Sequence, residues 1–113
     1  MPYIAISTST AMTEEQKDAL AADLGRNIGL IPSKLESNLM VDISTGHTMY
    51  RGSIKRELAF LDLRCYGMAE FKHKQAYTEA AIAAVQKVTG LPTDAIYLTY
   101  GEYGTWGTNG SLK

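Results

Sequence analysis

The segment Gly90-Leu91-Pro92-Thr93-Asp94-Ala95-Ile96-Tyr97-Leu98-Thr99-Tyr100 ends one predicted helix and begins the strand after it. A similar order occurs about sixty residues earlier, where Gly29-Leu30-Ile31-Pro32 precedes the strand-like stretch 39–43. Glycine followed closely by proline is a typical stop signal for a helix. The two segments therefore indicate that one structural unit occurs twice along the chain.

Each half begins with a predicted strand and continues into a predicted helix. Residues 3–8 alternate apolar and small or polar side chains, and residues 58–65 are strongly apolar. A capping box of Thr13 and Gln16 begins the first helix, which carries an apolar stripe that extends to Ile28; the second helix spans about 74–88. Each half is therefore a βαβ unit whose two strands lie parallel.

The predicted fold class is α+β, with two βαβ repeats that form a four-stranded sheet covered by two helices. We expect one domain over residues 1–113, with repeats at about 2–50 and 57–105 joined through residues 48–53. Two helices cover only one face of such a sheet. The third strand places Leu58 and Phe60 on one face and apolar residues on the other, which is typical of a strand buried on both faces. Self-association would cover the second face.

The composition excludes several classes of function. The formal net charge is -1, with 11 basic and 12 acidic residues, so a nucleic-acid or anionic-membrane partner is not expected. The one cysteine and two histidines show no metal-ligand spacing, and no phosphate-binding glycine motif occurs, so we predict neither a metal nor a cofactor. With no predicted signal peptide or membrane span, the expected location is the cytoplasm, with non-classical secretion left open.

Pro2 is the first candidate for a catalytic residue. Methionine followed by proline favours removal of Met1, which leaves a secondary amine at the chain start. An ordinary α-amino group has a pKa of about 7.7–8.0, and burial or a nearby cation lowers that pKa further. Such an amine is a suitable general base near neutral pH. The alternative is a proline with no catalytic role.

Three further side chains are candidates for binding an anionic substrate. Lys34, just after the Pro32 turn at the start of the second strand, could hold a carboxylate and lower the pKa of the proline amine. Arg64, at the end of the third strand, could also hold an anion. The Tyr97 hydroxyl could donate a hydrogen bond to a ligand. The alternatives are solvated surface positions for the two cations and a half-buried structural role for the tyrosine.

Seven short motifs extend along the chain in an order found in one known family. They are Met1-Pro2-Tyr3-Ile4, the turn from Gly29 to Lys34, Leu39-Met40-Val41, Met49-Tyr50-Arg51-Gly52-Ser53, Tyr66-Gly67, the segment from Gly90 to Tyr97, and Trp106-Gly107-Thr108-Asn109-Gly110-Ser111. In this order they resemble the macrophage migration inhibitory factor (MIF) family of the tautomerase superfamily. The resemblance implies a homotrimer with sites between neighbouring subunits, and keto–enol tautomerisation of phenylpyruvate-like 2-oxo acids.

The resemblance also implies roles for individual residues. Pro2 would move the proton, Lys34 would hold the carboxylate, and Tyr97 matches the family's pocket tyrosine. The backbone around Tyr66 stands where an isoleucine amide contacts ligands in the family. Two further substrate-binding positions carry different residues here: Asn38 replaces a tyrosine contributed across the interface, and Trp106 replaces a smaller apolar residue.

Departures from the family pattern leave other functions open. Thr99 stands where the family has a pocket asparagine, Thr108 replaces a tail tryptophan, and Lys113 replaces a terminal aromatic residue. The loop between Tyr97 and Gly107 is shorter than usual, and the CxxC motif of the animal cytokines is absent. One alternative is a MIF-like binding or signalling protein with vestigial tautomerase activity. Another is proline-dependent hydration or decarboxylation of a halogenated or unsaturated acid, for which we find no convincing set of residues.

Overall fold

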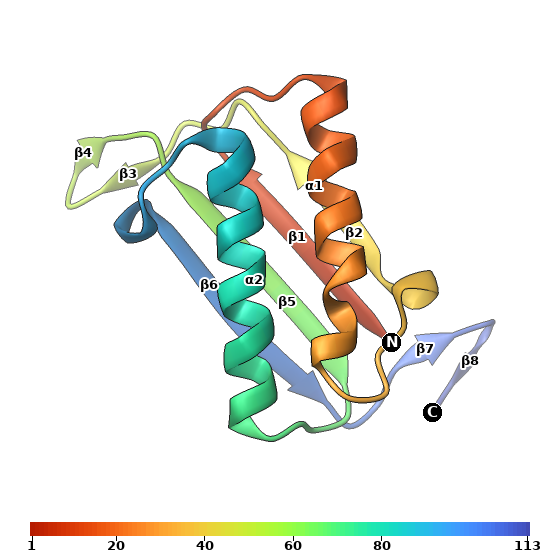
Figure 1. The fold of residues 1–113 in the computed structure, drawn as a ribbon. Coiled ribbons are helices and arrows are strands. Elements are labelled where there is room, and N and C mark those ends of the chain that lie inside the picture. Colours follow the sequence, from red (N-terminus) through yellow and green to blue (C-terminus); the bar gives the residue numbers. More distant parts are fainter.

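The fold consists of two helices packed on one face of a mixed four-stranded sheet (Figure 1). The computed structural model describes all residues, 1–113. The main elements are β1 (Pro2–Thr8), α1 (Glu14–Arg26), β2 (Met40–Ser44), β5 (Ala59–Tyr66), α2 (Phe71–Thr89) and β6 (Ile96–Tyr103). The short strands are β3 (Tyr50–Arg51), β4 (Ile54–Lys55), β7 (Gly107–Thr108) and β8 (Ser111–Leu112). Neither helix is long and apolar enough to cross a membrane.

The strand order β2-β1-β5-β6 confirms the repeated βαβ organisation. Within each repeat the two strands lie parallel, β1 beside β2 and β5 beside β6. The repeats meet where β1 and β5 pair antiparallel, with Ile4 opposite Leu63 and Pro2 opposite Cys65. The start of β1 therefore lies beside the end of β5.

Local signals define the helices, with some differences from the predicted bounds. The Thr13 hydroxyl accepts from the Gln16 amide at 3.1 Å and the Gln16 side chain accepts from the Thr13 amide at 2.9 Å, so the capping box is confirmed. The α-helical part of α1 ends at Arg26, and Ile28 lies in a following 3₁₀ turn, Ile28–Leu30. Helix α2 begins at Phe71, earlier than the predicted start at about residue 74. The prediction missed the first turn because that turn is exposed and shows no helical spacing of apolar residues.

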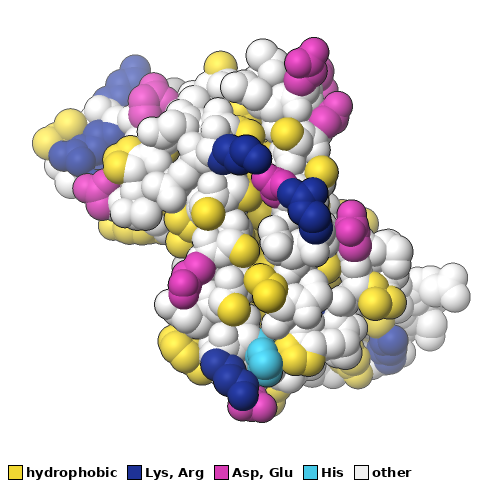
Figure 2. Space-filling view, viewed as in Figure 1, with side chains coloured by type: hydrophobic (Ala, Val, Ile, Leu, Met, Phe, Trp, Pro, Cys, Tyr) yellow, Lys and Arg dark blue, Asp and Glu magenta, His cyan; other side chains and the backbone are white.

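The core lies between the helices and the facing side of the sheet. In β1 the even-numbered residues Pro2 to Thr8 are buried, and in β5 the odd-numbered residues Ala59 to Cys65 are buried. Tyr77 of α2 is fully buried, and its hydroxyl donates to the Leu24 carbonyl oxygen at 2.9 Å. On the helix side of the molecule, charged side chains of both signs are interspersed (Figure 2).

The prediction that β5 is apolar on both faces is wrong for the outer face. The strand begins at Ala59, so Leu58 precedes it and is buried, and the outward positions are Phe60, Asp62 and Arg64. Asp62 and Arg64 form an ion pair at 2.8 Å. The exposed apolar side chains of this face come instead from three strands, and they include Met40, Phe60 and Tyr97.

The glycine-rich tail forms a hairpin. Strand β6 extends to Tyr103, beyond the predicted 96–100, and β7 and β8 then pair antiparallel. The Trp106 and Lys113 backbones exchange two hydrogen bonds, at 2.9 and 3.0 Å, and so close the hairpin. The hairpin leads the chain back beside the amino terminus (Figure 1).

Candidate active site at the amino terminus

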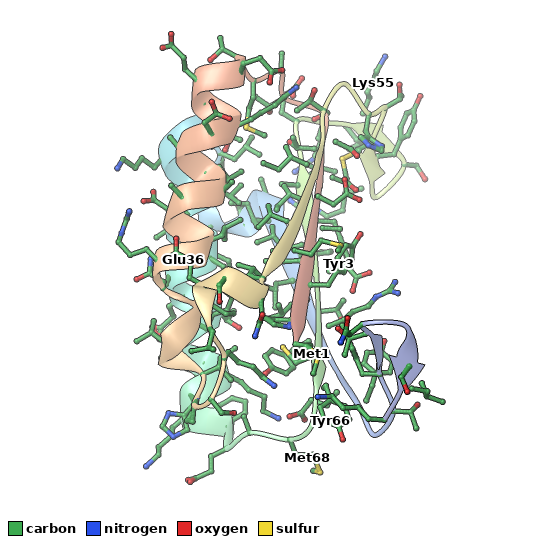
Figure 3. All side chains as sticks on the ribbon, turned by 90° about the vertical axis from the view of Figure 1, so that its right-hand side faces the viewer. Met1, Tyr3, Glu36, Lys55, Tyr66 and Met68 are labelled. Carbon is green, nitrogen blue, oxygen red and sulfur yellow. The ribbon has the colours of Figure 1, made fainter.

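A cavity of about 360 Å³ lies where β1 begins and β5 ends. Two loops form its walls, Ile31–Lys34 after α1 and Tyr66–Ala69 after β5, and Met1, Asn38 and Tyr100 complete the lining. The antiparallel pairing of β1 with β5 brings these parts together, because it places Pro2 opposite Cys65. Figure 3 shows Met1 close to Tyr66 at this end of the sheet.

Lys34 reaches the cavity from the loop between α1 and β2. Ser33 adopts a left-handed backbone, with φ of 67°, and the Lys34 amide donates to the Ile31 carbonyl at 3.2 Å. The Lys34 ammonium donates to the Tyr66 carbonyl oxygen at 2.6 Å. The prediction that Lys34 starts the second strand is wrong, because a 3₁₀ turn over Glu36–Asn38 separates it from β2.

Pro2, the residue after Met1, is fully buried. The Met1 carbonyl oxygen accepts from the Tyr66 amide at 3.2 Å. Burial, and next the positive charge of Lys34, lower the pKa of the Met1 amine from its ordinary value of 8.0; the charge of Lys113 also lowers it. An amine at this end of β1 is therefore in surroundings that favour its neutral form.

Two functional candidates on β6 were missed by the sequence analysis. The Tyr100 hydroxyl is buried and has no hydrogen-bond partner, and mainly its burial raises its pKa. Glu102 accepts from the Lys74 ammonium at 3.0 Å and from the Ala69 amide at 2.8 Å, which lowers its pKa. Both residues alternate with Ile96 along β6, so the period of two places them on the helix side of the sheet.

Arg64 and Trp106 lie at a different cavity, on the outer face of the sheet. This cavity has a volume of about 510 Å³ and also includes Tyr3, Met40 and Tyr103. The Arg64 guanidinium pairs with Asp62 and lies 6.0 Å from the centre of the Tyr3 ring. The structure therefore separates Arg64 and Trp106 from Lys34 within one chain.

Tyr97 lies toward the other end of the sheet. It is opposite Phe60 in the parallel pairing of β5 with β6, whereas Pro2 is opposite Cys65. Five residues along a strand correspond to about 16 Å. The Arg51 guanidinium lies 5.7 Å from the Tyr97 ring centre. Of the predicted site residues, Lys34, Asn38 and Tyr66 line this one cavity within a single chain, and Pro2 follows Met1, which lines it too.

The ionisable and metal-binding groups of this region are few. No group of three or more His, Cys, Asp or Glu side chains is placed to hold a metal ion. Cys65 is buried, and burial is the main cause that raises its thiol pKa. Besides an amine, an ammonium group and backbone amides, the cavity lining therefore supplies side-chain hydroxyl and amide groups, from Ser33, Asn38, Tyr66 and Tyr100.

Comparison with known proteins gives one family and one fold. The model of the family described as macrophage migration inhibitory factor matches residues 1–112. The crystal structure of MIF2 from Leishmania major is 21% identical, with a TM-score of 0.91 over 100% of this chain and 97% of that one. The MIF-like protein of Entamoeba histolytica is 20% identical, with a TM-score of 0.85 over 99% and 98%.

A third similar structure is that of Pt0534 inactivated by 2-oxo-3-pentynoate. It is 13% identical, with a TM-score of 0.79 over 89% of this chain and 85% of that one. No curated protein sequence matches significantly. At such low identities the similar structures establish only the fold. Membership of a family rests on the family model, which matches residues 1–112.

Proposed function

This chain belongs to the macrophage migration inhibitory factor family, and on that premise we propose that it is a tautomerase acting on 2-oxo acids such as phenylpyruvate. The observation that carries the proposal is a cavity lined by Met1 and Lys34, with the buried Pro2 as the next residue after Met1. The inactivation of Pt0534 by a 2-oxo acid gives this substrate class further support.

Pro2 is the proposed base after Met1 has been removed. With Met1 attached, the Pro2 nitrogen is an amide and carries no basic lone pair. In the processed chain the amine lies next to the place of the Met1 amine, whose pKa is lowered first by burial and then by Lys34. The neutral amine takes the enol hydroxyl proton and returns a proton to the neighbouring carbon, and the reverse steps convert ketone to enol.

Lys34 and the Tyr66 backbone are the proposed binding groups. The Lys34 ammonium would bind the substrate carboxylate and stabilise negative charge on the enolate oxygen. The Tyr66 amide now donates to the Met1 carbonyl, so removal of Met1 frees this donor for a ligand oxygen. The two donors lie near each other, because the Lys34 ammonium is hydrogen-bonded to the carbonyl oxygen of Tyr66.

The proposal includes a homotrimer, as the resemblance to the family implies. Met40, Phe60 and Tyr97 expose apolar surface on the outer face of the sheet. A neighbouring copy would cover this face and bring its own Tyr97 to the cavity, which a single chain does not do. Size-exclusion chromatography with light scattering would determine the number of copies, and a monomer would contradict this part of the proposal.

The test of the proposed base combines mass and kinetics. The intact mass of the purified protein should correspond to a chain that begins at Pro2. The substitution Pro2→Ala should lower kcat for phenylpyruvate tautomerisation by about 10²–10⁴-fold, because it replaces the proposed general base. Pro92→Ala, at an exposed turn before β6, is the matched control and should retain activity. Retention of Met1 in the purified protein, or full activity of the Pro2→Ala variant, would contradict this mechanism.

The second candidate function is binding or signalling with vestigial catalysis. Thr99 and Thr108, which replace family pocket residues, are both exposed in the chain. Negligible turnover of every enol tested, together with tight binding to a partner protein, would favour this function over the enzymatic one.

A further inference from the structure

Two ammonium groups lie on opposite parts of Tyr66. The Lys34 Nζ atom donates to its carbonyl oxygen at 2.6 Å, and the Lys113 Nζ atom lies 5.6 Å from the centre of its ring. Tyr66 lines the cavity at the amino terminus. The cavity therefore has one cation in its wall and a second one at the ring of the same tyrosine.

The tail hairpin fixes the backbone that carries the second cation. The Lys113 amide donates to the Trp106 carbonyl at 3.0 Å, and the Trp106 amide donates back at 2.9 Å. The Lys113 ammonium also lies near enough to the chain start to lower the pKa of the Met1 amine, as an addition to burial and Lys34. The positive charges of Lys34 and Lys113 thus both lower the pKa of the Met1 amine.

Neither ammonium group is neutralised by a carboxylate. All six ion pairs of the chain involve other cations. No aspartate or glutamate lines the cavity. Glu102, behind Ala69, already accepts hydrogen bonds at both of its oxygens, from Lys74 and from the Ala69 amide. Lys34 thus lies in the cavity wall without a paired carboxylate, although the charge of Glu102 interacts with it, and Lys113 adds a second unpaired ammonium group at the Tyr66 ring. A ligand with two negative groups would pair with both.

We propose that this cavity selects 2-oxo acids that carry a second carboxylate at the far end of the chain. Lys34 binds the carboxylate next to the reacting carbonyl, and Lys113 binds the distal one, with the Tyr66 ring against the carbon chain between them. Lys113 is then a specificity-determining residue. The inference rests on the proposed function for the substrate class, and it adds the second anionic group.

The experiment compares two ligands that differ by one charge. The affinity of the purified full chain for 2-oxoglutarate and for its 5-(N,N-dimethyl)carboxamide, which has no amide N–H and so cannot cyclise onto the ketone, is measured by calorimetry at low ionic strength. The acid should bind about five- to tenfold more tightly than the amide, as one partly desolvated charge pair allows. Added salt at 1 M should reduce the difference, because screening weakens the second pair.

Variants assign the difference to a residue. Lys113→Met should remove the preference and leave the affinity for the amide unchanged, whereas Lys113→Arg should retain the preference. Lys55→Met is the control, because it removes the same charge at the other end of the molecule, far from Met1 and Tyr66 (Figure 3).

Equal affinity for the two ligands, or a preference that persists in Lys113→Met, overturns the inference. Because binding is measured without turnover, this result is independent of whether Pro2 proves to be the base. If neither 2-oxo acid binds at all, the substrate class itself is wrong, and the inference fails together with the proposed function.

Discussion

The Lys34 ammonium and the Tyr66 carbonyl oxygen are joined by a hydrogen bond of 2.6 Å, which connects the loop after α1 to the end of β5. The bond holds a positive charge beside the start of β1, where it contributes to the lowered pKa of the amino-terminal amine after burial. In the proposed mechanism this one side chain would thus influence both substrate binding and the protonation state of the base.

The substitution Lys34→Met should therefore change two measurable quantities. The KM for a 2-oxo acid should rise about tenfold or more, because the variant lacks the charge that binds the carboxylate. The pKa of the amine should also rise, although burial still lowers it. Activity requires the neutral amine, so the acid limb of the kcat/KM profile should move to higher pH.

Lys34→Arg is the matched control, since it retains the charge and should shift the acid limb much less. Rates measured as a function of pH for the three proteins provide the comparison. If Lys34→Met has the wild-type KM and an unmoved acid limb, the role assigned to Lys34 is wrong.

Glu102 predicts a pH dependence of stability. Its hydrogen bonds from Lys74 and from the Ala69 amide lower its pKa below the ordinary value of 4.5. The native state thus binds this proton more weakly than the unfolded state, so the stabilisation is present in full above the unfolded pKa. It is lost as the pH falls through the lowered native value.

The substitution Glu102→Gln should lower the free energy of unfolding by about 1 kcal/mol at pH 7, within the range for a charge-assisted hydrogen bond in a partly exposed position. The difference from wild type should disappear in acid, where the wild-type carboxyl is also neutral. Urea denaturation at a series of pH values measures this difference. Glu79→Gln is the control, because Glu79 pairs with no cation, and an equal pH-dependent loss in that variant would contradict the assignment.

Features encoded by neighbouring residues could be predicted from the sequence. The capping box needs only Thr13 and Gln16, and both of its hydrogen bonds are present. The alternation in residues 3–8 likewise predicted a strand, and β1 spans Pro2–Thr8. In both cases the determining interactions lie within one turn or one strand, so no long-range information is needed.

The distribution of site residues depends on long-range pairing and was predicted only in part. Arg64 follows Leu63 and precedes Cys65, so the period of two places it on the outer face, a signal that was available but not used. Lys113 reaches Tyr66 only because the tail forms a hairpin closed by Trp106. No local pattern in a glycine-rich segment specifies that return.

The buried hydroxyl of Tyr77 predicts a loss of stability on removal. Tyr77→Phe should lower the free energy of unfolding by about 1 kcal/mol, because it removes the donor to the Leu24 carbonyl and leaves that acceptor without this partner. Chemical denaturation monitored by circular dichroism provides the value. Tyr50→Phe, at a side chain 62% exposed, should change stability by less than about 0.5 kcal/mol. Similar losses in both variants would show that the hydrogen bond from Tyr77 to the Leu24 carbonyl does not contribute to stability.

Gly29 and Gly90, which the sequence presents as equivalent helix stop signals, differ in backbone conformation. Gly90 is the C-cap of α2 with a left-handed φ of 74°. Gly29 lies within the 3₁₀ turn Ile28–Leu30 and has no positive φ. A Cβ added at either position would meet no atom within 4 Å, so any effect of alanine comes from the backbone alone.

Gly90→Ala should therefore destabilise the protein by about 1–2 kcal/mol, the cost of a left-handed conformation for a residue with a Cβ. Gly29→Ala should be neutral or should stabilise by up to about 1 kcal/mol, because alanine restricts the unfolded chain where the native backbone tolerates it. The midpoints of urea denaturation for the two variants should thus move in opposite directions or differ clearly in size. Equal shifts would contradict the assigned difference between the two repeats, because they would indicate a left-handed backbone at Gly29 as well.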